Sequence, residues 1–153
     1  MSGQAVVTIG DRAWTCVVAN TASELETGLS QTPNLPAGQG MLFDLGSSRN
    51  VTVNAYSMPY SIAVVFINED LLINGFSPML MPGYDITTVI PCRYFLEIGY
   101  EDLGDPQPQL GGTVSITGYS SPVSISAVIS IMMTAMIVMM MMQMMSKTIK
   151  EIK

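Results

Sequence analysis

The sequence predicts a mainly β domain with compact sandwich or jelly-roll character and one short helix, followed by a single C-terminal transmembrane α-helix. Short runs rich in β-branched and aromatic residues follow one another at close spacing, separated by turn residues, as in sandwiches and barrels. Nearly all charged residues lie between positions 11 and 105, and residues 106–146 carry no charge. Within that uncharged segment, residues 123–145 supply the roughly 20 apolar positions that a membrane-crossing helix needs.

Each β-rich run is a predicted strand. Gly10 and Asp11 separate the first two runs and are typical of a hairpin turn. Residues 61–68 are almost continuously apolar, which predicts a central strand buried on both faces. The predicted strands are residues 4–10, 12–20, 41–45, 51–57, 61–68, 71–78, 86–90, 92–100 and 113–119.

The short helix is predicted within residues 21–33. Thr21 or Ser23 can cap its N-terminus, Glu24 suits the positive end of the helix dipole, and Gly28 can end it. The remaining segments are rich in turn residues, so we expect a turn at 46–50 and loops at 34–40, 79–85 and 101–112.

The chain is predicted to divide into a β domain (residues 1–120), a transmembrane helix (121–146) and a short basic tail (147–153). Ser121 is a good N-cap, and Pro122 is tolerated in a first helical turn. These features predict a single-pass membrane protein with a C-terminal anchor. The lysines after the span favour a cytoplasmic C-terminus, whereas a tail-anchored protein would keep the β domain in the cytosol, so the orientation stays open.

Nine of the fourteen methionines lie in the predicted span. Methionine is an apolar, pliable helix former, and consecutive methionines point to all sides of a helix, which favours a membrane helix. Two alternatives remain: a soluble core helix, or a thioether site for Cu(I). Copper sites usually add Cys or His, and neither is near. The nine are Met132, Met133, Met136, Met139, Met140, Met141, Met142, Met144 and Met145.

Small polar residues recur at i, i+4 spacing inside the span, at Ser126, Ser130 and Thr134. Small side chains at this spacing let a second helix approach closely. The stripe therefore predicts helix packing, with membrane lipid and other transmembrane subunits, or copies of the same chain, as partners.

The composition excludes several classes of function. A net charge of −6 without a basic patch argues against nucleic-acid binding. The chain has no histidine, so no imidazole metal site or catalytic relay can form, and we expect no metal site, no cofactor and no catalytic residues. Cys16 and Cys92 are isolated; they are either two small buried residues or, in an oxidising compartment, a disulfide.

Several segments resemble, in order and spacing, the domain of unknown function 192 family. The resemblance covers about residues 4–119 and implies a compact, mainly β fold with a short helix; the family's biochemical function is not established, so it implies no reaction. The matching positions are Gly28-Leu29, Leu35-Pro36, Gly40-Met41-Leu42-Phe43, Pro59, Ile62, Phe66, Arg93, Tyr94, Leu96, Glu97 and a glycine at 111 or 112.

The chain departs from this family around Pro59. The family usually has Lys-Asn-Thr ahead of its proline and an aspartate two residues after it. Here Asn54 stands displaced before Pro59, and Ser61 replaces the acidic group. If the family's polar cluster binds a ligand, this chain has lost part of it.

Arg93 and Glu97 lie four apart on a predicted strand and therefore on one face. With Asn54 they form a candidate ligand-binding set, and the alternative is a purely structural use of Arg93 and Glu97. No second acid or base is evident for catalysis. We therefore expect a membrane-anchored, non-catalytic accessory or structural subunit of a larger membrane assembly. A membrane-tethered small-ligand-binding domain is the alternative, and an enzyme of unknown reaction is a weaker one.

Overall fold

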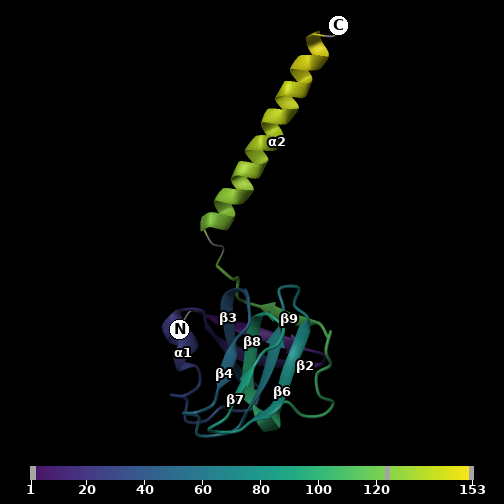
Figure 1. Cartoon of the computed structure of the whole chain (residues 1–153). Coiled ribbons are helices and arrows are strands. Elements are labelled where there is room, and N and C mark those ends of the chain that lie inside the picture. The colour runs from purple at the N-terminus through teal and green to yellow at the C-terminus, as the bar shows by residue number, and fades with distance from the viewer. Residues whose placement is uncertain (1–2, 123–124, 152–153) are drawn as a thin grey trace. The chain divides into compact units, whose positions relative to one another are not determined.

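A computed structural model describes residues 3–122 and 125–151, and within the C-terminal helix it describes the side chains of residues 132–148. The chain forms two compact units, Met1–Ser120 and Ser121–Lys153. The first unit is the β domain, and the second contains the C-terminal helix (Figure 1).

The β domain is built on one seven-stranded sheet in the order β6-β5-β8-β3-β2-β1-β9, with a two-stranded sheet of β4 and β7. The mainly β prediction is confirmed. The elements are β1 (Gln4–Ile9), β2 (Arg12–Ala19), α1 (Ala22–Thr27), β3 (Gln39–Arg49), β4 (Thr52–Asn54), β5 (Ile62–Ile67), β6 (Ile73–Leu80), β7 (Asp85–Thr87), β8 (Cys92–Gly99), the 3-10 helix η1 (Tyr100–Asp102), β9 (Val114–Thr117) and α2 (Ile125–Glu151).

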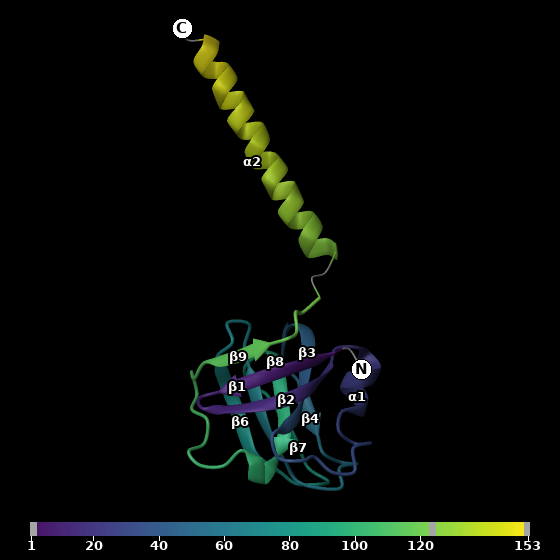
Figure 2. The same ribbon diagram turned by 180° about the vertical axis from the view of Figure 1, so that it is seen from behind.

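The large sheet curls into a half-barrel, which corrects the sandwich or jelly-roll prediction. In Figure 2, β9, β1 and β2 run across the direction of β6 and β8. The curl brings the loop before β9 onto β6, where the Ile73 N–H donates to the Gly112 carbonyl and the Gly111 N–H donates to the Ile73 carbonyl. After α1 the chain rejoins the same sheet, because β3 pairs in parallel with β2.

Local sequence signals account for the first elements. Gly10 has a φ of 62°, the left-handed conformation that the β1–β2 turn requires. The Thr21 side chain accepts a hydrogen bond from the Glu24 N–H, and the Glu24 side chain accepts one from the Thr21 N–H, which completes a capping box. Gly28 ends α1, so this helix prediction is confirmed.

Other boundaries differ from the predictions. The turn expected at 46–50 is wrong, because β3 continues to Arg49 with an irregular register after Asp44. The strands expected at 51–57 and 86–90 shorten to the three-residue β4 and β7. Residues 61–68 behave as predicted, since every residue of β5 is buried between β6 and β8.

Two hydrophobic clusters lie on opposite faces of the sheet. The first contains Trp14, Leu42 and Leu96 together with residues from both ends of the sheet, which the curl brings together. The second contains Phe43 and Phe95 and is covered by α1, β4 and β7. It is this covered face that holds the pocket described below.

Both cysteines are buried and free. Cys16 belongs to the first cluster and Cys92 to the second, so the sheet separates their thiols. Burial raises the pKa of Cys16 to about 12 and that of Cys92 to about 11, which keeps both thiols protonated and inert at neutral pH. Of the two alternatives, the structure shows the small buried residues.

The C-terminal segment is one continuous helix, as predicted, and α2 runs past Lys147 to Glu151. The predicted basic tail is therefore largely helical, and charged residues belong to the helix itself. The transmembrane part of the prediction is not supported by the described residues: among them, which in α2 means the side chains of residues 132–148, no helix is long and apolar enough to cross a membrane.

Candidate functional site

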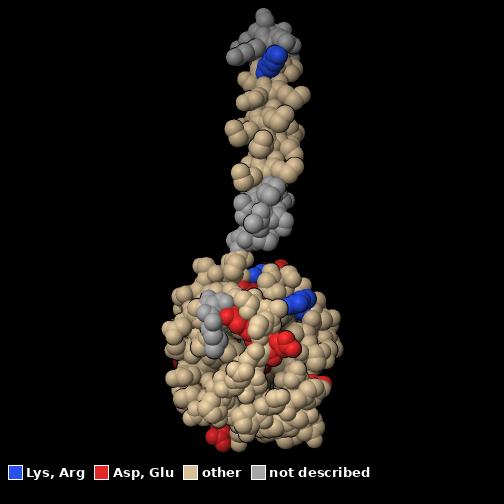
Figure 3. All heavy atoms as spheres, turned by 90° about the vertical axis from the view of Figure 1, so that its left-hand side faces the viewer, with Lys and Arg blue, Asp and Glu red and all other residues tan. Residues whose placement is uncertain are grey.

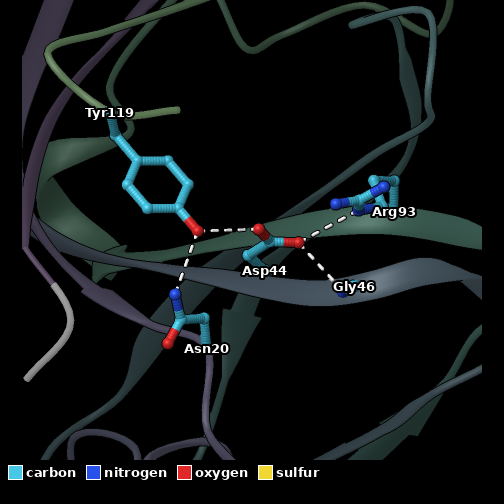
Figure 4. Close-up of polar contacts among 5 residues, drawn as sticks. All are labelled: Asn20, Asp44, Gly46, Arg93 and Tyr119. Atoms are coloured by element: carbon cyan, nitrogen blue, oxygen red, sulfur yellow. Dashed lines mark hydrogen bonds and ion pairs between the residues drawn. The ribbon is translucent and has the colours of Figure 1, made fainter. Parts of the chain in front are cut away.

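Arg93 is held by a buried carboxylate that the sequence analysis missed. Its Nε lies 3.0 Å from Asp44 Oδ1, and the two side chains are 17% and 1% exposed. Figure 4 shows the Arg93 side chain pointing to Asp44 from the neighbouring strand. A lone carboxylate in an otherwise apolar strand, residues 41–45, was the signal available in the sequence.

Three further groups complete this Asp44 cluster. The Gly46 N–H donates to Asp44 Oδ1 at 2.9 Å, and the Tyr119 hydroxyl donates to Oδ2 at 2.8 Å. The Asn20 amide in turn donates to the Tyr119 oxygen at 3.1 Å. The cluster therefore ties the end of β2, β3, β8 and the segment after β9 together (Figure 4). These contacts are the kind expected of a structural use of Arg93, and its ligand-binding role stays a prediction.

Glu97 lies in different surroundings, on the second cluster's face. Its side chain is 5% exposed and lines an open cavity of about 420 Å³, which we call the Glu97 pocket. The walls come from α1 and the turn after it, from β3 and the segment that follows, from β4, and from β8. This volume lies in the range of small-molecule sites.

The floor of the pocket is aromatic. Phe43 and Phe95 are directly paired across β3 and β8, and their rings stack with centroids 4.2 Å apart. A Cβ added to Gly28 would lie 3.4 Å from Phe43 Cζ and 4.0 Å from Glu97 Oε2. The backbone at the end of α1 thus passes close to both the ring and the carboxyl group.

Burial dominates the electrostatics of Glu97 and raises its pKa to about 8. Among the described residues, none donates a hydrogen bond to this carboxyl group or forms an ion pair with it. Tyr60 lies near this charge: burial first, and then the charge of Glu97, raise the pKa of the Tyr60 phenol, whose buried oxygen has no hydrogen-bond partner among the described residues. A buried carboxyl without a partner is the kind of perturbed group that marks functional sites.

The structure brings together two of the three predicted ligand-binding residues. Asn54 is exposed on β4 and lines the Glu97 pocket. Arg93 does not line this pocket, although it shares β8 with Glu97. Residue type and strand spacing could not show that Arg93 and Glu97 lie in different surroundings, because the residues around each come from distant parts of the chain.

The β domain is strongly acidic, with eleven Asp and Glu residues and three arginines up to residue 120. In the view of Figure 3, most of its surface is uncharged, with several acidic groups and few basic ones. Within the described residues, no three Cys, Asp or Glu side chains are placed to hold a metal ion. An electrically neutral or positively charged ligand suits this surface better than an anion.

The predicted helix-packing residues are only partly described. Thr134 is exposed on α2, whereas the side chains of Ser126 and Ser130 lie outside the described residues. Their packing role therefore stays a prediction, as does the alternative of copper binding by the methionines.

Comparisons with known proteins confirm the family resemblance. The sequence profile of the family DUF192, described as uncharacterized ACR, matches residues 5–116. A crystal structure of a candidate transcription regulator from Sinorhizobium meliloti 1021 superposes with a TM-score of 0.70 at 23% identity, over 78% of this chain and 98% of that one.

A protein of unknown function from Novosphingobium aromaticivorans DSM 12444 superposes with a TM-score of 0.63 at 20% identity, over 73% of this chain and 83% of that one. At these identities the two structures show a shared fold alone. No curated protein sequence matches the chain significantly.

Proposed function

The chain belongs to the domain of unknown function 192 family, and because that family's description names no activity, we propose a function from geometry: the β domain is a non-catalytic module that binds a small molecule in the Glu97 pocket. The observation that carries this proposal is Glu97 itself, a buried carboxyl group lining an open cavity with no described partner. Leaving such a group unpaired costs stability, so its retention in a pocket suits a binding role.

A binding role is favoured over catalysis because the pocket offers one buried ionisable group. Glu26 is the other carboxylate on its wall, and that residue is exposed on α1. General acid–base chemistry needs a second group positioned against the reacting atoms. Chemical conversion of a bound compound would support the enzyme alternative instead.

The proposal is tested with a variant whose side chain blocks the mouth of the Glu97 pocket. Asn54→Trp places a large ring at the rim from an exposed position on β4, so we expect it to abolish binding while the domain stays folded. Ligand-observed NMR with a library of small aromatic amines, alcohols, amides and carboxylates measures binding to the full-length chain. Ser48→Trp, exposed on β3 and outside the pocket, is the matched control and should bind like the parent. Equal binding by both variants, or no binding by the parent, would contradict the proposal.

A second candidate function, as an accessory subunit of a larger assembly, rests on a separate observation. The nine methionines of α2 from Met132 to Met145 are between 58% and 69% exposed, and they surround the helix. A helix segment that exposes this many apolar side chains favours an interaction surface. The spacing of Ser126, Ser130 and Thr134 favours another apolar helix as the partner.

Ser130→Leu tests this assembly. A bulky side chain in the stripe should prevent close approach and weaken association, whereas Ser130→Ala should cost only about 0.6 kcal/mol. Native-size analysis of the parent and both variants in mild detergent measures the association. A Ser130→Leu variant that assembles like the parent would contradict helix packing on this stripe. A parent that stays monomeric but binds phosphatidylcholine vesicles would identify lipid as the cover.

A further inference from the structure

We propose that the Glu97 pocket selects a small organic cation, a primary amine with an apolar body, whose ammonium group donates hydrogen bonds to the Glu97 carboxylate. This inference rests on the proposed function and adds to it the chemical class of the ligand.

Glu97 has no partner among the described residues. Its carboxyl group is almost fully removed from water, and no described residue supplies a positive charge or a donor to it. An ionised carboxylate in such a place is stable only with a counter-charge. Because no described residue pairs with the Glu97 carboxyl group, a ligand that supplies a positive charge will gain from filling the site.

The charges around the pocket favour a cation over an anion or a metal ion. An anion would have to approach Glu97 and Glu26 across an acidic domain, which opposes its binding. Arg49 is the basic residue on the pocket wall. A metal ion would need more ligating side chains than the described residues bring together. A primary ammonium needs one carboxylate, and its remaining N–H groups can use the oxygen of the Asn54 amide and the hydroxyl of Ser57, both on the wall.

The pocket also has apolar walls that suit the body of a ligand. Phe43 and Phe95 form the floor beside Glu97, and Met58 and Val53 add apolar wall. Aromatic faces attract a nearby cation and bury an apolar group. The pocket therefore fits an amine that carries a small hydrocarbon or aromatic portion.

Binding of an ammonium requires Glu97 to lose its proton. Burial holds the pKa of Glu97 at about 8, so at lower pH each binding event releases one proton. The affinity should therefore rise about tenfold per pH unit from roughly pH 6 towards pH 8 and then level off. The other ionisable groups lining this pocket are Glu26 of α1 and Arg49 of β3, and the Tyr60 phenol interacts electrostatically with Glu97. A neutral ligand that accepts a hydrogen bond from protonated Glu97 would instead bind more weakly above about pH 8.

The experiment compares benzylamine with benzyl alcohol, which has a similar shape and no charge, by calorimetric titration of the full-length chain. We expect benzylamine to bind the parent at least about tenfold more tightly at roughly pH 8. Glu97→Gln should remove this preference, and Glu69→Gln, the matched control at an exposed position outside the pocket, should keep it. Circular dichroism checks that both variants are folded, and Glu97→Gln keeps the shape of the side chain.

Each outcome decides a different point. If benzyl alcohol binds as tightly as benzylamine, or if Glu97→Gln retains the amine preference, the ligand class is wrong and the binding pocket stands. If Asn54→Trp changes nothing because no compound of either charge binds the parent, both the ligand class and the proposed function are wrong. The rising affinity with pH must accompany amine binding; a flat or falling profile overturns the role of Glu97.

Discussion

Replacing Asp44 by alanine is expected to lower the free energy of unfolding by about 3–5 kcal/mol. The change leaves Arg93 without its ion-pair partner at a largely buried position and removes the acceptor of the Tyr119 hydroxyl. Breaking one half of a buried pair costs far more than the pair contributes, because the remaining charge stays desolvated. Urea denaturation followed by tryptophan fluorescence measures the loss, since Trp14 lies in the core.

Two variants control for this interpretation. Asp70→Ala removes an exposed turn carboxylate and should change the stability by less than about 0.5 kcal/mol. Adding Arg93→Met to Asp44→Ala should recover part of the loss, because no buried charge then remains. An Asp44→Ala variant as stable as the parent would show that the Asp44 cluster does not hold the strands together.

The second large effect is a stability that falls as the pH rises. Burial raises the pKa of folded Glu97 to about 8 from an ordinary value of 4.5, so between these values the folded state binds a proton that the unfolded state has lost. The stability that this bound proton contributes is fully present below the pKa of Glu97 in the unfolded chain. It is lost as the pH rises through the pKa of Glu97 in the folded protein. We expect the parent to lose on the order of 4 kcal/mol between about pH 5 and pH 8.

In this chain, few groups other than Glu97 change their protonation between about pH 5 and pH 8. There is no histidine, and the pKa values of both cysteines are raised far above neutrality, so few other groups titrate in the window. Urea denaturation across the pH series should show a nearly flat profile for Glu97→Gln, and this variant should be more stable than the parent at about pH 8. Glu26→Gln should retain the parental slope. A parent whose stability is constant over the same range would refute the buried, unpaired state of Glu97.

Local chemistry made part of this fold predictable. The Gly10 turn, the Thr21–Glu24 capping box and the buried β5 each depend on residues close in sequence, and the structure confirms all three. The curl of the sheet depends on distant pairings, such as β3 with β8 and the loop before β9 with β6. The same alternating pattern fits a sandwich or a half-barrel, so strand patterns alone could not choose between them.

The candidate site was predictable to a similar degree. Asn54 and Glu97 could be selected by residue type, but they meet only because α1 and β4 cover the same face of the sheet. Arg93 was grouped with Glu97 by spacing on β8, whereas its partner Asp44 is 49 residues away in the chain. The apolar length of α2 was evident from the sequence, and its membrane insertion stays a prediction.

The pairing of the first strand with the last has a consequence for biosynthesis. β1 pairs with β2 on one side and with β9 on the other, from Val6 opposite Thr117 to Ile9 opposite Val114. During translation the outer edge of β1 therefore stays open until almost the whole β domain has left the ribosome. An unpaired edge is a template for another chain, and such late, long-range closure is slow. The nascent domain is thus most exposed to misassembly before its final strand arrives, a period in which chaperones would have their greatest effect.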